Sequence, residues 1–412
     1  MMEKQYWWQA WPRFLLWSHA ISVAGFYLIQ WQRTYPDKKD RVIPLPVQKV
    51  SSTEAVTDGT NPPVSVIVPA RNEEHNIRRC VTSLLEQDYD NYEVIVVDDE
   101  STDGTGHILD ELIQTHPRGN LLWVLRLREL PENWAGKTHA IHRGVQEANG
   151  DWLLFTDADT WHAPNAIRSS VTQAVQEQAD LFTLGSKQEL PTFWERVMMP
   201  MAYLGISMLY PPRKVNDPTS PLAIANGQYI LIRRQAYEEI GGYAHPALRK
   251  TVLDDRDLAQ VVKDHGYRLR FVDGRDLVSV RMYQGFADLW RGWRKNAYLG
   301  NRGGAGFVLL ELAGLPMITI VPFLLPFLGQ RIATKAHVFP TRKEARLAAL
   351  FELLPLLAYR SWLNRSMDVP WYYAFTHPLA GVLFEGILGQ SMWRVLSKRG
   401  VDWRGRMYHN DL

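Results

Sequence analysis

The chain has 412 residues, enough for one large domain or two of ordinary size. Its 46 basic and 44 acidic residues nearly balance, so the composition does not indicate a polyanionic partner such as nucleic acid. The single cysteine, Cys80, excludes a disulfide framework and a multi-cysteine metal site, and the twelve histidines do not show the spacing of a zinc site.

The first apolar segment covers residues 14–31 (FLLWSHAISVAGFYLIQW) and contains no Asp, Glu, Lys or Arg. Its length is close to the ~20 residues that cross a bilayer, and tryptophans around it are typical of a membrane interface. Because it lacks a small-x-small cleavage site, we interpret residues 1–34 as a transmembrane anchor and not as a signal peptide. Three basic residues follow, and the positive-inside rule then places the remainder of the chain in the cytoplasm: Lys38, Lys39 and Arg41.

Residues 35–62 are rich in Pro, Ser, Thr and charge and are predicted to form a linker. Between residues 63 and 300, short apolar runs alternate with helical patterns. The expected strands are 64–70, 92–99, 121–127, 151–159, 180–187, 228–234 and 268–274. The expected helices are 73–86, 103–115, 137–148 and 164–178. This alternation predicts an α/β domain with a mostly parallel sheet and helices on both faces.

Acidic residues follow several of these strands. In LLFTDAD (153–159), an extended chain would place Asp157 and Asp159 on one face, where they repel each other unless a positive charge lies between them. A divalent cation meets that need, because hard cations prefer oxygen ligands. Ligands of parallel sheets bind beyond the carboxyl ends of the strands, so Asp98 and Asp99 are expected to converge with this pair.

The segment 193–212 begins with the Met-rich run FWERVMMPMAYLGISMLY and is interrupted by Pro200. It is predicted either to pack as a core helix or to lie in the membrane interface, where it would bring the site to a lipid.

Residues 301–412 are predicted to form a C-terminal membrane region. It contains three apolar stretches: 305–329, 347–364 and 371–396. The first holds three prolines, which break helical hydrogen bonding: Pro316, Pro322 and Pro326. We therefore expect the first stretch to be a re-entrant or interfacial hairpin and the other two to span the bilayer, which keeps the basic stretches around them in the cytoplasm.

Five segments in this order resemble the family 2 glycosyltransferases of the Rossmann-like GT-A fold: VIVPARNEE, VIVVDDESTDGT, WAGKTHAIHRGV, FTDAD and VLDDRDLAQVVKDHGYRLRF. The stretch LPENWAGK, the Met-rich segment and the flanking membrane segments are similar to the hopene-associated and carotenoid glycosyltransferase branch. The resemblance implies an integral enzyme of the bacterial plasma membrane. It would transfer a hexose, by default glucose from UDP-glucose, to a lipid acceptor such as a carotenoid or hopanoid. UDP-N-acetylglucosamine and UDP-galactose stay open as donors, and diacylglycerol and polyprenyl phosphate as acceptors.

The resemblance also implies roles for individual residues. Those matching donor-binding positions are Pro69, Arg71, Glu73, Asp98 or Asp99, Lys137 and Asp157. Asp157 and Asp159 match the D-x-D motif that holds the ribose and a divalent cation, Mg²⁺ or Mn²⁺. Asp255 matches the catalytic base of the E-D-x-x-L motif, in which Asp254 replaces the glutamate. Since carboxylates favour a helix N-terminus, one of this pair can cap the helix while the other faces the substrate.

The segment RGWRK departs from the Q/R-x-x-R-W motif of processive synthases. Arg291 and Arg294 have the right spacing to contact a diphosphate, but Lys295 stands where tryptophan is expected. In those synthases the tryptophan helps to bind a growing glycan, so its absence favours a single transfer to a non-sugar acceptor. The alternative for the two arginines is a basic face beneath the membrane.

Sugar transfer from a nucleotide diphosphate needs a base on the acceptor side and stabilisation of the departing diphosphate on the other. This opposed placement predicts inversion at the anomeric carbon. The competing hypotheses are a processive polysaccharide synthase, a catalytically inactive membrane scaffold and, from the fold alone, a nucleotidyltransferase.

Overall fold

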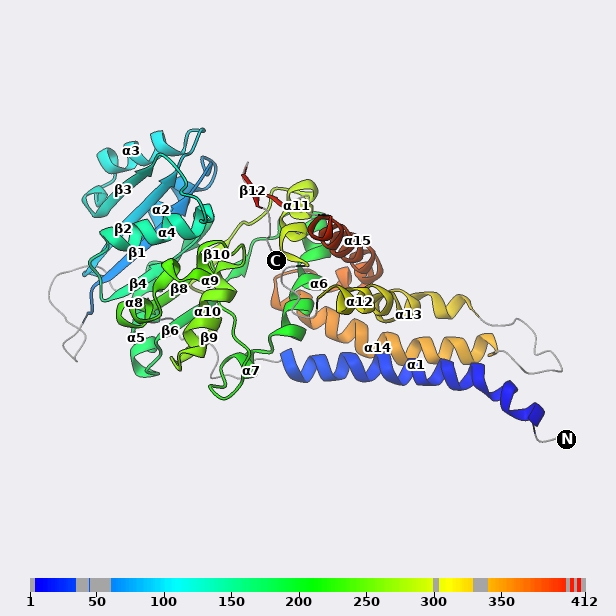
Figure 1. Cartoon of the computed structure of the whole chain (residues 1–412). Coiled ribbons are helices and arrows are strands. Elements are labelled where there is room, and N and C mark those ends of the chain that lie inside the picture. The colour runs from blue at the N-terminus through cyan, green and yellow to red at the C-terminus, as the bar shows by residue number, and fades with distance from the viewer. Residues whose placement is uncertain are drawn as a thin grey trace.

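The computed structural model describes residues 4–34, 44, 61–298, 304–328, 340–397, 401–403 and 406–408. The predicted linker 35–62 lies almost entirely outside these ranges. An α/β domain forms one end of the molecule, and long helices that include both α1 (Lys4–Thr34) and α14 (Arg342–Ser366) form the other (Figure 1).

A seven-stranded sheet with the order β3-β2-β1-β4-β8-β6-β9 forms the centre of the α/β domain. The strands are β1 (Val64–Ala70), β2 (Tyr92–Asp99), β3 (Leu122–Leu127), β4 (Trp152–Phe155), β6 (Leu181–Gly185), β8 (Ile230–Arg233) and β9 (Leu269–Asp273). All neighbouring strands are parallel except β8, which is antiparallel to both β4 and β6. The predicted α/β fold with a mostly parallel sheet is therefore confirmed.

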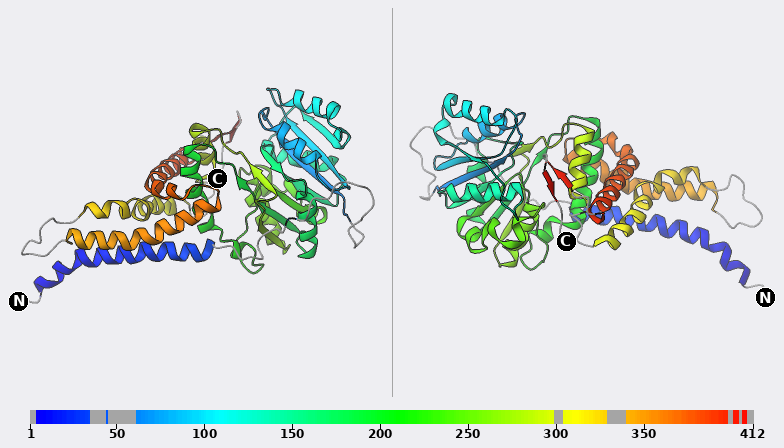
Figure 2. Two further views of the ribbon diagram at one scale, coloured as in Figure 1. Left: turned by 180° about the vertical axis from the view of Figure 1, so that it is seen from behind. Right: turned by 45° about the horizontal axis from the view of Figure 1, so that its top comes forward.

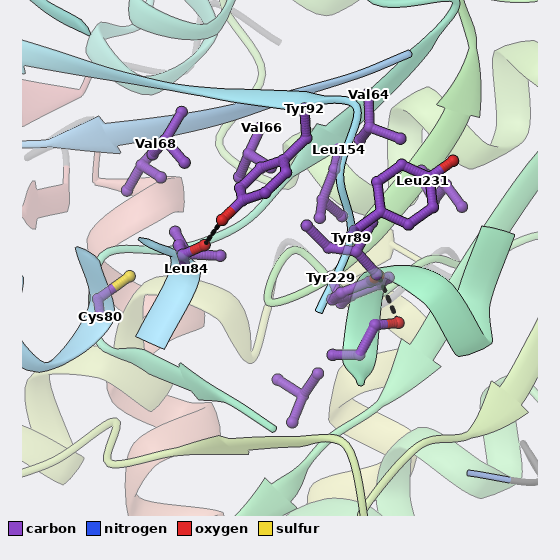
Figure 3. Packing of buried hydrophobic residues seen from close by; sticks show 14 of the residues in the cluster. Val64, Val66, Val68, Cys80, Leu84, Tyr89, Tyr92, Leu154, Tyr229 and Leu231 are labelled. Atoms are coloured by element: carbon purple, nitrogen blue, oxygen red, sulfur yellow. Dashed lines mark hydrogen bonds between the residues drawn. The ribbon is translucent and has the colours of Figure 1, made fainter. Parts of the chain in front are cut away.

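Helices cover both faces of this sheet, because the strands are apolar on both sides. Alternate residues of β1 belong to two separate cores: Val66 packs in one and Ile67 in the other. In the first core, shown in Figure 3, the Tyr92 hydroxyl donates a hydrogen bond to the Leu84 carbonyl at 3.0 Å and Cys80 is fully buried. The helices of this face are α2 (Ile77–Leu85), α3 (Thr105–Thr115) and α5 (Ala166–Gln176). Those of the other face include α4 (Gly136–Glu147), α8 (Arg234–Glu239) and α10 (Asp254–Asp264).

A smaller sheet lies next to the end of β4. Its order is β5-β10-β7, made of β5 (Thr160–His162), β10 (Val278–Val280) and β7 (Lys187–Gln188). Because β5 follows β4 after four residues, this small sheet holds the loop that carries Asp157 and Asp159.

Helix α6 (Phe193–Leu209) connects the α/β domain to the helical end (Figure 1). A capping box formed by Thr192 and Glu195 starts the helix, which continues through Pro200. Val197 packs toward α1 and α14, whereas Met198 packs toward α11 (Phe286–Asn296) and α15 (His377–Leu396). Burial on several faces favours the core-helix alternative over a helix lying in the membrane interface.

Helices α1 and α14 run side by side, as all three views in Figures 1 and 2 show. Polar contacts join them: His19 Nδ1 lies 2.9 Å from Glu352 Oε1, and Thr34 Oγ1 lies 3.1 Å from the Tyr359 hydroxyl. Arg360, also on α14, donates to the Val197 carbonyl of α6 at 2.7 Å. The helical end is thus tied to the helix that enters the α/β domain.

Among the described helices, two are long and apolar enough to cross a membrane: Trp11–Thr34 and Gly304–Phe327. The second differs from the sequence-based expectation of a hairpin. Helix α12 (Gly304–Thr319) continues through Pro316 and is interrupted only at Ile320. The other two prolines lie near the starts of α13 (Val321–Leu324) and the 3₁₀ helix Leu325–Phe327, where a missing N–H is tolerated.

The two segments expected to span the bilayer form α14 and α15, and neither meets the same criterion of length and hydropathy. Both helices carry charged side chains within these segments: α14 buries Glu352 and Arg360, and α15 contains Glu385 and Arg394.

Candidate active site

A cavity of about 320 Å³ lies at the carboxyl ends of β1, β2 and β4. Residues from distant parts of the chain line it, including Pro69, Arg71, Glu73, Asp99, Lys137, Asp157, Asp159, Met199, Tyr203, Gly227, Asp254, Asp255, Trp293 and Lys295. Of the four acidic residues that the sequence predicts to converge at this sheet edge, Asp99, Asp157 and Asp159 line the cavity.

Asp157 and Asp159 occupy a turn, because β4 ends at Phe155, earlier than predicted. The Thr160 side chain closes this turn by donating to the Asp157 carbonyl at 2.7 Å. The extended geometry inferred from the sequence is thus wrong here, but the turn still brings both carboxylates to the cavity.

Lys137, in the first turn of α4, lies between two carboxylates. Its Nζ is 2.8 Å from Asp157 Oδ1 and 3.1 Å from Asp254 Oδ2. Burial disfavours the charged amine, but the carboxylates of Asp157, Asp254 and Asp255 outweigh burial and hold the Lys137 pKa well above its usual range. Lys137, which the resemblance assigned to donor binding, therefore supplies positive charge between Asp157 and Asp254.

Of the adjacent carboxylates Asp254 and Asp255, Asp255 is the one whose two oxygens accept hydrogen bonds from backbone amides. The Gly227 N–H donates to Asp255 Oδ2 at 3.1 Å, and the Arg256 N–H donates to Asp255 Oδ1 at 2.7 Å. Burial, followed by the charge of Asp254, raises the Asp255 pKa to about 6, against the opposing effect of Lys137 and the two amides. A carboxyl group with this pKa is ionised at pH 7 and is a stronger base than an ordinary aspartate.

Gly227 is a site residue that the sequence analysis missed. A Cβ at this position would lie 3.0 Å from Lys137 Nζ, 3.4 Å from Asp255 Oδ2 and 3.6 Å from Asp157 Oδ2. The available signal was an isolated glycine at the start of the predicted strand 228–234, since such glycines often mark a close approach of the backbone to other groups.

On the opposite side of the cavity, Arg71 Nη1 donates to the Asp99 carbonyl at 2.7 Å, and Glu73 accepts a hydrogen bond from Asn76 at 3.0 Å. Asp98 does not line the cavity, and its Oδ1 accepts a hydrogen bond from the Ser101 amide at 3.1 Å. Of the two aspartates that matched the uracil-binding position, Asp99 is thus the one that reaches the site.

The arginines of the RGWRK segment do not line the cavity in this structure. Arg291 is exposed, with its guanidinium 3.6 Å from Asp288. Instead, α11 turns Trp293 and Lys295 toward the cavity, and the Trp293 indole N–H donates to Met199 Sδ at 3.4 Å. Burial lowers the pKa of Lys295 to about 8. Neither Trp293 nor Lys295 was identified as a site residue from the sequence.

The net charge of the residues that line this cavity indicates whether a metal cation could bind there. Six carboxylates line the cavity, against three basic groups (Arg71, Lys137 and Lys295). A nucleotide diphosphate would meet a negatively charged surface there, so an additional cation would favour its binding. Within the described ranges, no group of three His, Cys, Asp or Glu side chains could hold a metal by itself. A hard cation on the D-x-D carboxylates therefore fits this donor set if substrate oxygens complete its coordination.

Comparison with known proteins agrees with the fold. Residues 65–241 match the family model described as glycosyl transferase family 2. The 4,4'-diaponeurosporenoate glycosyltransferase of Staphylococcus aureus (strain USA300) is 24% identical over 352 residues, which cover 84% of this chain and 88% of that protein. The protein of the same name from strain MRSA252 is also 24% identical over 352 residues, with the same coverage of both chains.

Among solved structures, the mannosyltransferase PcManGT from Pyrobaculum calidifontis, in complex with GDP-Man and Mn²⁺, superposes with a TM-score of 0.50 and 17% identity. The match covers 94% of this chain and 99% of that one. This likeness confirms the expected GT-A fold.

Proposed function

We propose that the protein is a membrane-anchored enzyme that moves one hexose from a UDP-sugar to the hydroxyl of a hydrophobic lipid. The match of residues 65–241 to the glycosyl transferase family 2 model supports this proposal. UDP-glucose is the default donor, and a carotenoid or hopanoid is the proposed acceptor. The observation that carries the proposal is the position of Asp255, which lies in one cavity with Asp157, Asp159 and Lys137.

Asp255 is the proposed general base. It accepts the proton of the acceptor hydroxyl as the acceptor oxygen bonds to the anomeric carbon. The amides of Gly227 and Arg256 fix its orientation, and Lys137 neutralises Asp254, which would otherwise repel a second negative charge nearby. This division of roles explains why two adjacent aspartates stand at the start of α10.

The leaving diphosphate takes the electron pair of the bond that breaks. Asp159, together with Asp157, would hold a divalent cation, Mg²⁺ or Mn²⁺, which when bound supplies charge stabilisation to the diphosphate. Lys295 adds a cationic group from α11, and Arg71 adds another beside the nucleotide half of the cavity. With the base and the leaving group on opposite sides of the sugar, the reaction inverts the anomeric carbon.

A hydrophobic acceptor is supported by the helical half of the chain and by the relative's name. The diaponeurosporenoate glycosyltransferase aligns over 84% of this chain, a share too large for the α/β domain alone. The proposed orientation has Trp11–Thr34 in the plasma membrane and the catalytic cavity on the cytoplasmic side, where nucleotide sugars are available.

The proposed function is tested by following a radiolabelled sugar into its product and by determining the anomeric configuration of that product. Membranes containing the protein are incubated with radiolabelled UDP-glucose, UDP-N-acetylglucosamine or UDP-galactose, and the products are extracted with organic solvent. We expect label in a discrete organic-soluble product, with a β-linkage in the proton NMR spectrum. Label in a polymer that stays out of the organic phase would favour a polysaccharide synthase, and an α-linked product would contradict inversion.

A further inference from the structure

A second and larger cavity, of about 540 Å³, lies beside the catalytic one. The two cavities share four lining residues: Tyr203, Ile206, Asn226 and Asp255. The proposed base therefore lies on the boundary between them. We call the second cavity the side pocket, and its volume is within the range of ~300–1,000 Å³ that is typical of small-molecule sites.

The walls of the side pocket are mainly apolar. They include Tyr210, Val215, Ile224, Phe271, Trp362 and Leu363. Two of its basic side chains are paired within the same lining: Lys187 Nζ lies 2.6 Å from Asp368, and Arg275 Nη2 lies 2.7 Å from Asp273. Since Asp255 and Asp276 add two further carboxylates to this lining, the pocket suits an uncharged apolar ligand better than an anionic nucleotide.

The position of the side pocket links it to the membrane helices. Thr34, the last residue of the apolar helix Trp11–Thr34, lines the pocket. One turn earlier, Trp31 stacks on Trp362 with ring centroids 6.0 Å apart, and Trp362 is itself part of the lining. Tryptophan pairs of this kind are typical of the level at which a helix leaves the bilayer.

We propose that the side pocket binds the apolar tail of the acceptor lipid, which enters beside the cytoplasmic end of α1 and presents its hydroxyl to Asp255. This assignment rests on the proposed function, because it gives the glycosyl acceptor its route to the base. It names the acceptor by its chemistry: a long uncharged hydrocarbon chain ending in a hydroxyl. The nucleotide sugar occupies the other cavity, so the two substrates meet at Asp255.

The pocket can be tested by photocrosslinking without any turnover. The full-length protein in liposomes is irradiated with a diazirine-bearing long-chain alcohol, and the labelled peptides are identified by mass spectrometry. We expect label on the segments that contain Tyr210 and Trp362, competed by unlabelled long-chain alcohol. Label confined to the exposed apolar surface of α12, without competition, would overturn the proposal.

Two substitutions that fill the pocket from different walls complete the test: Ile224→Trp and Leu363→Trp. Each is expected to reduce crosslinking at the pocket at least fivefold and to raise the KM for the lipid acceptor more than tenfold. Leu354→Trp is the matched control, because Leu354 lies on the same helix as Leu363 but is 63% exposed. Equal crosslinking and equal acceptor KM in all three variants would contradict the assignment.

The outcomes separate this proposal from the proposed function. Crosslinking at the pocket without any sugar transfer would retain the lipid site and remove the glycosyltransferase activity. Lipid glycosylation that is insensitive to both filling variants, with no crosslink at the pocket, would retain the activity and remove the site.

Discussion

At the scale of single residues, the catalytic cavity is organised by one lysine. Lys137 Nζ contacts Asp157 from the turn after β4 and Asp254 from the start of α10, and so connects the proposed donor side of the cavity to the side of the proposed base. Asp255, next to Asp254, remains on backbone amides and faces both cavities. The lysine thus neutralises the neighbours of the proposed base without pairing with the base itself.

The raised pKa of Asp255 predicts the pH dependence of transfer. The base must be ionised, so kcat/KM is expected to fall tenfold per pH unit below about 6 and to level off above that value. Since the charge of Lys137 lowers the Asp255 pKa, Lys137→Gln should move this acidic limb to higher pH. A pH profile of both proteins checks the sign, and an unchanged limb in Lys137→Gln would contradict the electrostatic account.

The D-x-D carboxylates predict a metal requirement. Chelation of metal ions is expected to stop sugar transfer, and added Mn²⁺ or Mg²⁺ is expected to restore it. The substitution Asp159→Asn should raise the half-saturating metal concentration about tenfold or more, because one oxygen ligand loses its charge. Titration of transfer with Mn²⁺ measures this. Asp264→Asn, at the end of α10 and outside the cavity lining, is the control. Full activity of the chelated wild type would refute the requirement.

At the scale of elements, the site depends on how closely the turn before β8 approaches α4 and α10. Gly227→Ala would place a methyl group 3.0 Å from Lys137 Nζ and 3.4 Å from Asp255 Oδ2. Since a misplacement of about 1 Å can cost ~10²-fold in rate, kcat should fall 10- to 100-fold while the fold is retained.

The matched control for this substitution is Gly389→Ala, because a Cβ at Gly389 meets no atom within 4 Å. Steady-state kinetics and circular dichroism of both variants make the comparison. A Gly227→Ala enzyme with the wild-type kcat would show that the close approach has no catalytic importance.

A buried ion pair anchors α5 to the segment between α2 and β2. Arg168 Nη2 lies 2.8 Å from Asp88 Oδ2, and both side chains are nearly inaccessible. Asp88→Ala would remove the carboxylate that faces the buried Arg168 guanidinium and should lower the free energy of unfolding by roughly 3–5 kcal/mol.

The control is Asp110→Ala, which removes an exposed pair with Arg126 and should cost about 0–1 kcal/mol. Urea unfolding followed by circular dichroism distinguishes the two. Similar urea midpoints for the two variants would contradict the predicted contribution of the buried ion pair.

The same elements show what can be inferred from the sequence. The bounds of β1 and β2 were predicted to the residue, because each apolar run is followed at once by polar residues. The end of β4 was missed by several residues, since its pairing with β1 stops at Phe155 and that limit is set by the neighbouring strand. The side of α11 that faces the cavity was also not predicted. Burial of Leu289 and a hydrogen bond from Trp290 to Gln390 orient the helix, and motif spacing does not contain that information.

The candidate site also divides into residues that local sequence patterns predict and residues that only tertiary packing brings together. The acidic residues at the strand ends could be grouped from the order of strands alone, because parallel strands end at one edge of a sheet. Gly227, Trp293 and Lys295 come from segments well removed in sequence from the acidic motifs, and they reach the cavity only through tertiary packing. Local patterns offered only the isolated glycine at position 227 and no signal for Trp293 or Lys295.

At the scale of the whole molecule, two cavities with different linings lie between the sheet and the helical end. The charged one lies in the domain that matches the glycosyl transferase family 2 model, and the mainly apolar one extends to the last residue of α1. Asp255 lines both, so a water-soluble donor and a membrane-borne acceptor can reach the same carboxylate from opposite directions. This arrangement is the central claim: one base serves two substrates that arrive from two phases.

The most direct test counts released UDP and organic-soluble label in one reaction, using membranes that carry the wild type, Asp255→Asn or Asp264→Asn with Mg²⁺ or Mn²⁺. The claim predicts that the wild type and Asp264→Asn transfer sugar to lipid, while Asp255→Asn loses ~10²–10⁴-fold of that rate. Equal lipid labelling by Asp255→Asn and the wild type would show that Asp255 is not the base and would contradict the claim.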